Sequence, residues 1–293
     1  MDPRPPQWLP PGTPEPVTSP PPPPSPFGAK PTPLWKRLGA PLIAAGLLAF
    51  KFAAKLKGLV LLLPKLKILT TSGSMLVSVG AYSLIWGWRF ALGFVVLLLV
   101  HELGHVIQLR REGIPASAPL FIPFLGAVVA AKSLGGNATA EARVGLAGPV
   151  LGTIGAAACI PLAELTGNDM FTALAFTGFF LNLFNLLPVV PLDGGRAMAA
   201  MAPWMWFVGF AAMVAMVFVF PNPILLIILL LGGFETWRRW KERRAGKGAE
   251  GNPSYYDVKP IHRLAVAAVY IGLIVVLGIG MSETHLERTF DDA

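Results

Sequence analysis

Apolar runs separated by short polar or proline-containing segments dominate the chain after residue 70. These runs cover about residues 71–88, 90–109, 144–163, 170–190, 197–220, 223–237 and 261–281. A helix needs about 20 mostly apolar residues to cross the hydrocarbon core of a bilayer, and most of the runs approach that length. The pattern therefore predicts an all-α polytopic membrane protein with about six or seven transmembrane helices.

One apolar segment, residues 114–131, does not have the sequence of an ordinary helix. Three prolines and a glycine interrupt it, and a proline inside a helix removes a backbone hydrogen bond. Backbone polar groups cannot face lipid without a partner. We therefore expect a small re-entrant hairpin that packs against protein, next to the apolar run that precedes it.

The composition agrees with a membrane protein. Hydrophobic residues make up 54% of the chain and charged residues 14%, whereas a soluble domain carries about 25% charged residues. Cys159 is the single cysteine, which excludes an intrachain disulfide and a cysteine-rich metal site.

Basic residues gather at the ends of the apolar runs and give the chain a net charge of +8. One group lies within residues 36–67, Arg110 and Arg111 follow the second run, and another group lies within 238–247. Because each group flanks an apolar run, we interpret them as cytoplasmic anchors and expect no nucleic-acid partner. This places the N-terminus inside and the acidic C-terminal tail outside, as in a cell (inner) membrane protein.

The chemistry centres on residues 101–105, which read His-Glu-Leu-Gly-His. On a helix, positions four apart share a face, so His101 and His105 point toward one metal ion. Glu102 then reaches the water that the metal activates and serves as general base. The alternative is a pair of buried histidines held by hydrogen bonds; the apolar run before the motif favours a functional site, because ionisable groups are costly in a membrane.

A catalytic zinc ion needs a third protein ligand. Asp193 follows an apolar run that two prolines interrupt, and Gly194 and Gly195 allow close approach of the backbone. Its alternative role is to cap the next helix. His262 and His285 lie near or beyond the end of the last run, so we expect them at the interface or in solvent. Asp193 is therefore the strongest candidate.

These motifs resemble those of the site-2 protease family of intramembrane zinc metalloproteases. The family pattern N-x-x-P-x-x-x-x-D-G is matched by Asn185, Pro188, Asp193 and Gly194. The resemblance covers roughly residues 70–220. It implies one zinc ion (Zn2+) per chain on His101, His105 and Asp193, with Glu102 as base. It also implies that Asn185 positions the substrate or its oxyanion; an interhelical hydrogen bond remains the alternative for that residue.

The resemblance implies hydrolysis of peptide bonds in or near transmembrane segments of membrane protein substrates. Such a segment must unwind before its peptide bonds are accessible, for instance by pairing in extended form with residues 114–131. One rival is a metal-ion transporter or channel that uses the same intramembrane His, Glu and Asp, and another is a catalytically idle scaffold. Transporters often show repeated halves, and no repeat is apparent in the sequence.

The resulting organisation has six parts. They are a disordered proline-rich tail (1–33), basic membrane-surface helices (34–69), the intramembrane metalloprotease core (70–237), a basic cytoplasmic loop (238–260), a C-terminal transmembrane helix (261–281) and a polar tail (282–293). A spanning hairpin is the alternative for the second part. The proline-rich tail is interpreted as solvated, with a proline-reading partner as the alternative.

Overall fold

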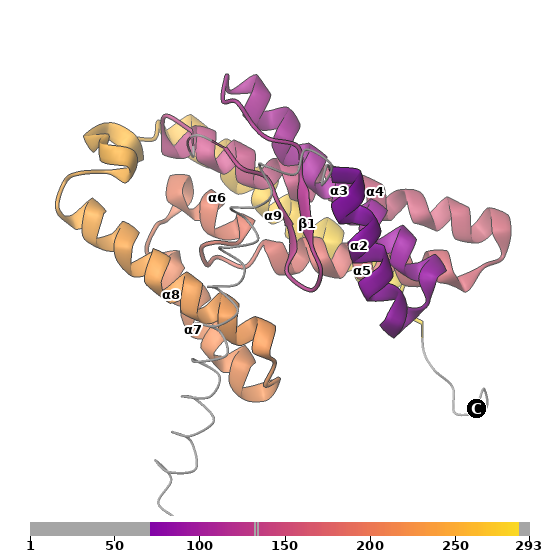
Figure 1. The fold of residues 1–293 in the computed structure, drawn as a ribbon. Helices are drawn as coiled ribbons and strands as arrows, with labels where there is room; N and C mark the ends of the chain where they lie inside the picture. Colours follow the sequence, from indigo (N-terminus) through magenta and orange to yellow (C-terminus); the bar gives the residue numbers. More distant parts are fainter. Residues whose placement is uncertain (1–70, 132, 134, 287–293) are drawn as a thin grey trace, which may run out of the picture. The chain divides into compact units, whose positions relative to one another are not determined.

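The computed structural model describes residues 71–131, 133 and 135–286. The predicted tail 1–33, the predicted surface helices 34–69 and the last part of the polar tail lie outside the described residues. Most of the described chain is helical (Figure 1). The helices are α2 (Thr71–Trp86), α3 (Trp88–Arg111), α4 (Ala138–Thr166), α5 (Asp169–Asn185), α6 (Asp193–Met201), α7 (Met205–Val219), α8 (Pro223–Arg244) and α9 (Pro260–Glu283).

Three of these helices, α3, α4 and α9, are long and apolar enough to cross a membrane by length and composition. Many large apolar side chains also face outward, among them Leu84, Leu165 and Phe218, which are each more than four-fifths exposed. Such side chains are costly in water and suited to lipid. The prediction of a mostly helical membrane protein is therefore confirmed in its coarse form.

Asparagine side chains fix where several helices begin. Asn137, Asn168 and Asn222 precede α4, α5 and α8, and each side-chain oxygen accepts a backbone N–H of the first turn. The bond from the backbone N–H of Ala140 to Asn137 measures 2.9 Å. These caps supply acceptors for backbone donors that a helix leaves unpaired at its N-terminus.

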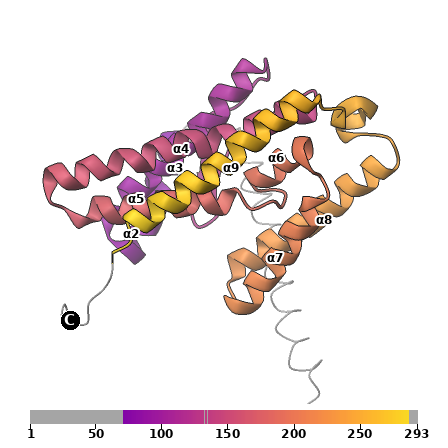
Figure 2. The ribbon, with the colours of Figure 1, turned by 180° about the vertical axis from the view of Figure 1, so that it is seen from behind.

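Helix α4 is the central element, because it packs against α3, α5, α6 and α9 (Figure 2). Its contact with α3 is close: a Cβ atom on Gly104 would overlap the backbone carbonyl of Ala147. Small residues let two helix backbones approach in this way, which is typical of packing in membranes. The approach brings the motif-bearing face of α3 directly against α4.

Residues 114–131 form a hairpin rather than a helix, which confirms the hairpin, while its re-entrant position in the membrane stays a prediction. Its strands β1 (Leu120–Ile122) and β2 (Gly126–Val128) pair antiparallel, with Phe121 opposite Ala127. The hairpin packs on α2 and α3: the backbone N–H of Phe121 donates to Ser74 Oγ at 3.1 Å. Tyr82 accepts from the backbone N–H of Phe124, also at 3.1 Å.

Two expectations about the second half of the chain are wrong in detail. The apolar run 197–220 is not one helix, because α6 ends at Met201 and α7 begins at Met205 after Pro203. The predicted loop from residue 238 begins as helix, because α8 continues through Arg244. Ion pairs of Arg238 with Glu235 and Glu242, three and four residues away, support this extension. The rest of the loop holds two short 3₁₀ turns, η1 (Ala249–Gly251) and η2 (Pro253–Tyr256).

Candidate metal centre

Three buried side chains converge at the contact of α3, α4 and α6. His101 and His105 lie one turn apart on α3, and their Nε2 atoms are 3.1 Å apart. Oδ2 of Asp193, the first residue of α6, lies 3.2 Å from each of these nitrogens. The structure thus brings together the three residues that the sequence predicted as metal ligands, although 92 residues separate His101 from Asp193.

Hydrogen bonds on the far side of each ring fix the protonation of the two histidines. His105 Nδ1 lies 2.8 Å from the backbone carbonyl of Val144, which can only accept. His101 Nδ1 lies 2.8 Å from Asn182 Oδ1, and the amide nitrogen of Asn182 donates to the carbonyl of Gly178. Both Nδ1 atoms therefore carry the proton as donors, and both Nε2 atoms offer a lone pair to the centre.

The N-terminus of α6 is held against the end of α5, and this position aims Asp193 at the histidines. A Cβ atom on Gly194 would overlap the carbonyl of Leu186, and one on Gly195 would overlap the backbone of Val189. Positions 194 and 195 therefore have no room for a side chain. The cap position of α6 is Leu192, and Asp193 is the first residue of the helix with its carboxylate directed at the histidines, so the capping alternative does not describe it.

Glycines on α4 form the wall of the centre opposite α3. A Cβ atom on Gly148 would lie 2.8 Å from His101 Nε2 and would overlap the ring of His105. One turn further along, a Cβ atom on Gly152 would overlap the side chain of Asn182. A glycine at position 148 is therefore required for the space at the centre.

Glu102 is buried beside the two histidines. Its carboxylate oxygen and the ligand nitrogens of His101 and His105 all lie within 4.8 Å of one another. Asn185 is placed differently: it is the last residue of α5, is half-buried, and forms no side-chain hydrogen bond within the described residues. The asparagine that touches the centre is Asn182, which the sequence analysis did not identify. The helical spacing of Asn182 and Asn185 was the available signal.

The other two histidines, His262 and His285, do not belong to the metal centre. His262 is exposed in the first turn of α9, and His285, beyond the end of α9, packs edge-on against the ring of Phe176. Both positions agree with the expectation that these residues are not ligands.

The three converging atoms fit a divalent metal ion. Two lone pairs and a carboxylate oxygen face one another at 3.1–3.2 Å, an arrangement that repels unless a cation or protons occupy its centre. Zinc at about 2.0–2.1 Å from each ligand in a tetrahedral site needs ligand atoms roughly 3.3 Å apart. Two imidazoles with one carboxylate form a known set for catalytic zinc, with a further position open.

A second buried charged cluster joins α4, α8 and η2. Glu141 on α4 accepts from Arg239 on α8 and from the hydroxyl of Tyr255 in η2, both at 2.7 Å. Burial and the neighbouring Glu141 carboxylate raise the pKa of the Tyr255 hydroxyl, which keeps its proton for this bond. Arg239 also pairs with Glu235 at 2.8 Å.

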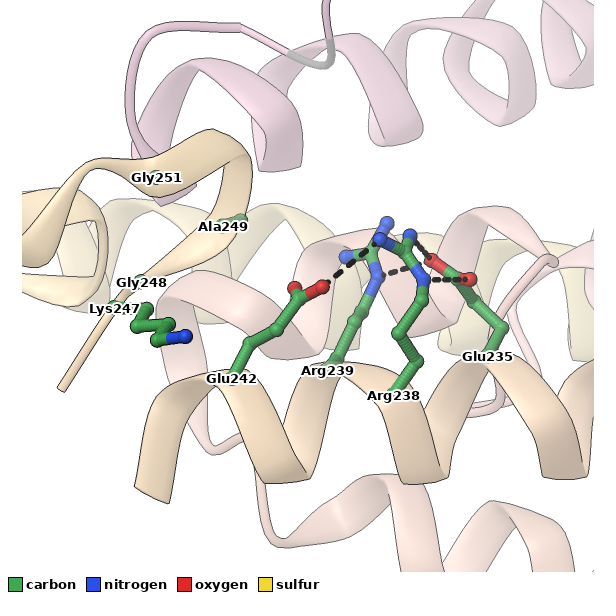
Figure 3. Close-up of a pocket in the computed structure, with 8 residues that line it drawn as sticks. All are labelled: Glu235, Arg238, Arg239, Glu242, Lys247, Gly248, Ala249 and Gly251. Atoms are coloured by element: carbon green, nitrogen blue, oxygen red, sulfur yellow. Dashed lines mark hydrogen bonds and ion pairs between the residues drawn. The ribbon is translucent and has the colours of Figure 1, made fainter. Parts of the chain in front are cut away.

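A cavity of about 440 Å³ opens beside this cluster, between α8 and η1 (Figure 3). Figure 3 shows Glu235, Arg238, Arg239 and Glu242 rising from α8 with their charged ends joined to one another. These four charges therefore have partners within the protein.

Residues 89–168 match the model of Peptidase family M50. The match includes the His-Glu-Leu-Gly-His motif, and Asn185 and Asp193 lie beyond it. The resemblance to site-2 proteases is thereby confirmed, and the chain is an integral membrane protein.

Two similar proteins carry names of the same kind. "Zinc metalloprotease MJ0392" of Methanocaldococcus jannaschii is 30% identical over 123 residues, which cover 40% of this chain and 35% of that protein. "Putative zinc metalloprotease Rip3" of Mycobacterium tuberculosis is 35% identical over 139 residues, which cover 42% of this chain and 34% of that protein. The chain spans about a third of the length of the curated relatives that it matches.

Proposed function

We propose that the chain is an intramembrane zinc metalloprotease that hydrolyses peptide bonds in or near transmembrane segments of membrane protein substrates. The observation that carries the proposal is the convergence of His101, His105 and Asp193 beside Glu102. The match to Peptidase family M50 and the zinc metalloprotease names of the relatives support it. No feature of the described residues favours the transporter alternative.

In this proposal His101, His105 and Asp193 hold one zinc ion. The ion would polarise the substrate carbonyl and lower the pKa of a bound water molecule to about 7. Glu102 accepts the proton that the attacking water loses and delivers it to the leaving amine. Asn182 and the carbonyl of Val144 keep the Nδ1 protons of the two histidines in place, so both rings stay oriented toward the ion.

We further propose how a substrate segment reaches the centre. The hairpin offers an extended edge with which an unwound segment can pair. Strand β1 is tied to α2 through Phe121 and Ser74, which leaves β2 as the strand for pairing. Asn185, whose amide has no partner within the described residues, is then proposed to hold the substrate or its oxyanion.

The membrane topology belongs to the same proposal. The chain has about six or seven spans, the hairpin is re-entrant, and the active site lies near the cytoplasmic side of the cell (inner) membrane. Basic residues at the C-terminal ends of α3 and α8 support this orientation. Reporter fusions at residues 245–250 and after residue 286 test it, since they are expected on opposite sides of the membrane.

The activity is tested by reconstituting the purified chain with candidate single-span membrane proteins. Mass spectrometry identifies any cleaved bond, and the Glu102→Gln variant is the matched control. Cleavage within or beside the transmembrane segment by the intact chain alone supports the proposal. Zinc-dependent movement of metal ions across sealed vesicles without any cleavage would support the transporter instead.

A further inference from the structure

A groove with a volume of about 490 Å³ lies between α3, α4 and α9. Its lining includes Gly104, which precedes the ligand His105, and Ala147, which precedes the wall residue Gly148. The groove therefore adjoins the α3–α4 contact on which the metal centre is built, but none of the proposed metal ligands lines it.

The lining side chains are sorted along the groove into a polar end and an apolar channel. The polar side chains belong to the last turns of α3 and the first turns of α4 and α9, and they are Gln108, Arg111, Thr139, Arg143 and His262. The apolar side chains lie deeper along the same helices, and they are Ile107, Leu146, Val150, Leu151, Val266 and Val269.

The polar end carries net positive charge. Arg111 is exposed and pairs with no carboxylate among residues 71–131, 133 and 135–286. Arg143 is bound by Glu112 at 2.8 and 3.0 Å, but only about half of its side chain is covered. With one carboxylate for two guanidinium groups, the end of the groove retains the capacity to bind an anion. Arginine suits a phosphate because its planar fork donates two parallel hydrogen bonds.

The length of the apolar channel and the charge at its polar end indicate what lies along it. From Thr139 to Leu151, α4 advances roughly 18 Å at 1.5 Å per residue. An apolar helix along that length would leave the guanidinium groups of Arg111 and Arg143 without an anion at the polar end. A free phosphate would leave the apolar channel without an occupant. A phospholipid places a charged group at the polar end and a narrow hydrocarbon chain along the rest.

We infer that this groove is a binding site for one anionic phospholipid. The phosphate lies at Arg111 and Arg143, and one acyl chain runs along Ile107, Val150 and Val269. Basic pockets between transmembrane helices commonly bind anionic headgroups. The lipid would fill the space behind the α3–α4 contact and so support the packing of α9 on α4.

The test uses the full chain in detergent and measures lipid binding by native mass spectrometry. Phosphatidylglycerol and phosphatidylcholine with identical acyl chains are compared. We expect phosphatidylglycerol to bind more tightly, and Arg111→Gln to weaken its binding about fivefold, as is typical for one basic residue at a lipid headgroup. Arg110→Gln is the matched control: it removes an equal charge from the same turn, but Arg110 does not line the groove.

A second variant tests the apolar channel. Val150→Trp places a large side chain in the groove and should reduce binding of both lipids, with zinc content and thermal unfolding measured to show that the chain is folded. Equal binding of the two lipids, or equal losses in Arg110→Gln and Arg111→Gln, would overturn the inference. These measurements need no protease activity, so Glu102→Gln should bind lipid like the intact chain even if the proposed function fails.

Photo-crosslinking from position 269 distinguishes the remaining occupants. A benzophenone side chain there should capture phospholipid in native membranes. A covalent dimer of this chain, or an adduct with another protein in place of lipid, contradicts the inference.

Discussion

Within residues 71–131, 133 and 135–286, two buried clusters of charged and polar side chains are built on opposite principles. In the metal centre, the ligand atoms of His101, His105 and Asp193 converge on one point. In the Glu141 cluster, each charge is met by an opposite charge or a donor from another segment of the same chain. Both clusters lie against α4: Glu141 belongs to that helix, and Gly148 of the same helix faces the two histidines.

The difference teaches how to separate a binding site from a structural ion pair. Glu141 accepts from Arg239 and Tyr255, so its cluster is complete without any added group. The converging atoms of the metal centre have no such partners in the chain and repel one another unless a cation or protons join them. Burial alone does not distinguish the two clusters, because Glu141 is as deeply buried as His101. The balance of hydrogen-bond donors and acceptors distinguishes them.

The two clusters are also connected. The indole nitrogen of Trp206 donates to the carbonyl of Gly195 at 2.7 Å, two residues from Asp193. The guanidinium group of Arg239 lies 5.8 Å from the centre of the Trp206 ring. Through these contacts the Glu141 cluster braces α6, the helix that presents Asp193.

The largest expected effect comes from removing a metal ligand. His101→Ala and Asp193→Ala should each reduce zinc from about one ion per chain to a small fraction, because a three-ligand site loses a direct bond. Elemental analysis of purified variants measures this. The matched control is His262→Ala, since His262 lies outside the centre and should leave the zinc content unchanged. Full zinc occupancy in Asp193→Ala would remove Asp193 from the ligand set.

Glu102→Gln sharpens the comparison by separating chemistry from assembly. Glutamine has the size of glutamate but does not accept the proton, so cleavage should fall by about 10²–10⁴-fold. Zinc should stay bound, because the variant keeps all three ligands. Cleavage rates and zinc content measured on one preparation decide the matter. Near-normal cleavage by this variant would refute the proposed mechanism.

Breaking the Glu141 cluster should affect stability before it affects chemistry. Arg239→Met leaves Glu141 charged and buried without its ion partner, which costs about 3–5 kcal/mol. Adding Glu141→Gln removes the charge and keeps an acceptor for Tyr255, so the double variant should recover most of that loss. Unfolding in detergent, followed by circular dichroism, measures both. If the double variant does not recover stability, the Arg239–Glu141 ion pair does not stabilise the fold in the way proposed.

Asn182→Ala should weaken the metal centre without removing a ligand. The variant loses the acceptor that orients His101, and such partners typically change metal affinity or activity by about 10–100-fold. Competition with a zinc chelator measures the affinity. Asn185→Ala is the natural control, because Asn185 forms no hydrogen bond with the histidines and its loss should change cleavage rather than zinc binding. Equal zinc affinities in intact chain and Asn182→Ala would contradict the role of Asn182.

The smallest effect is expected at the N-terminus. Deleting residues 1–33 should leave zinc binding and unfolding temperature unchanged, because that segment lacks the apolar content to contribute to a core. Zinc analysis and thermal unfolding of the truncated chain test this. Loss of zinc at unchanged expression would show that the segment has a structural role.

The sequence alone determined the parts of this protein that depend on local pattern. Apolar runs indicated a helical membrane protein, and the prolines of residues 114–131 indicated a hairpin. The four-residue spacing of His101 and His105 placed both rings on one helix face, because that spacing is a property of any α-helix. Scarcity of ionisable residues in apolar runs singled out Asp193, and the match to Peptidase family M50 agrees with the resemblance drawn from these motifs.

Only the tertiary structure decided which segments meet. It showed that α6 is separate from α7, that α8 continues to Arg244, and that Asn182 rather than Asn185 contacts His101. It also showed why residue 148 is a glycine: the imidazole rings of His101 and His105 occupy the space that a side chain would need. None of this follows from local pattern, because the contacts join segments far apart in the chain. Their positions depend on how closely α3, α4 and α6 pack, which is a property of the whole fold.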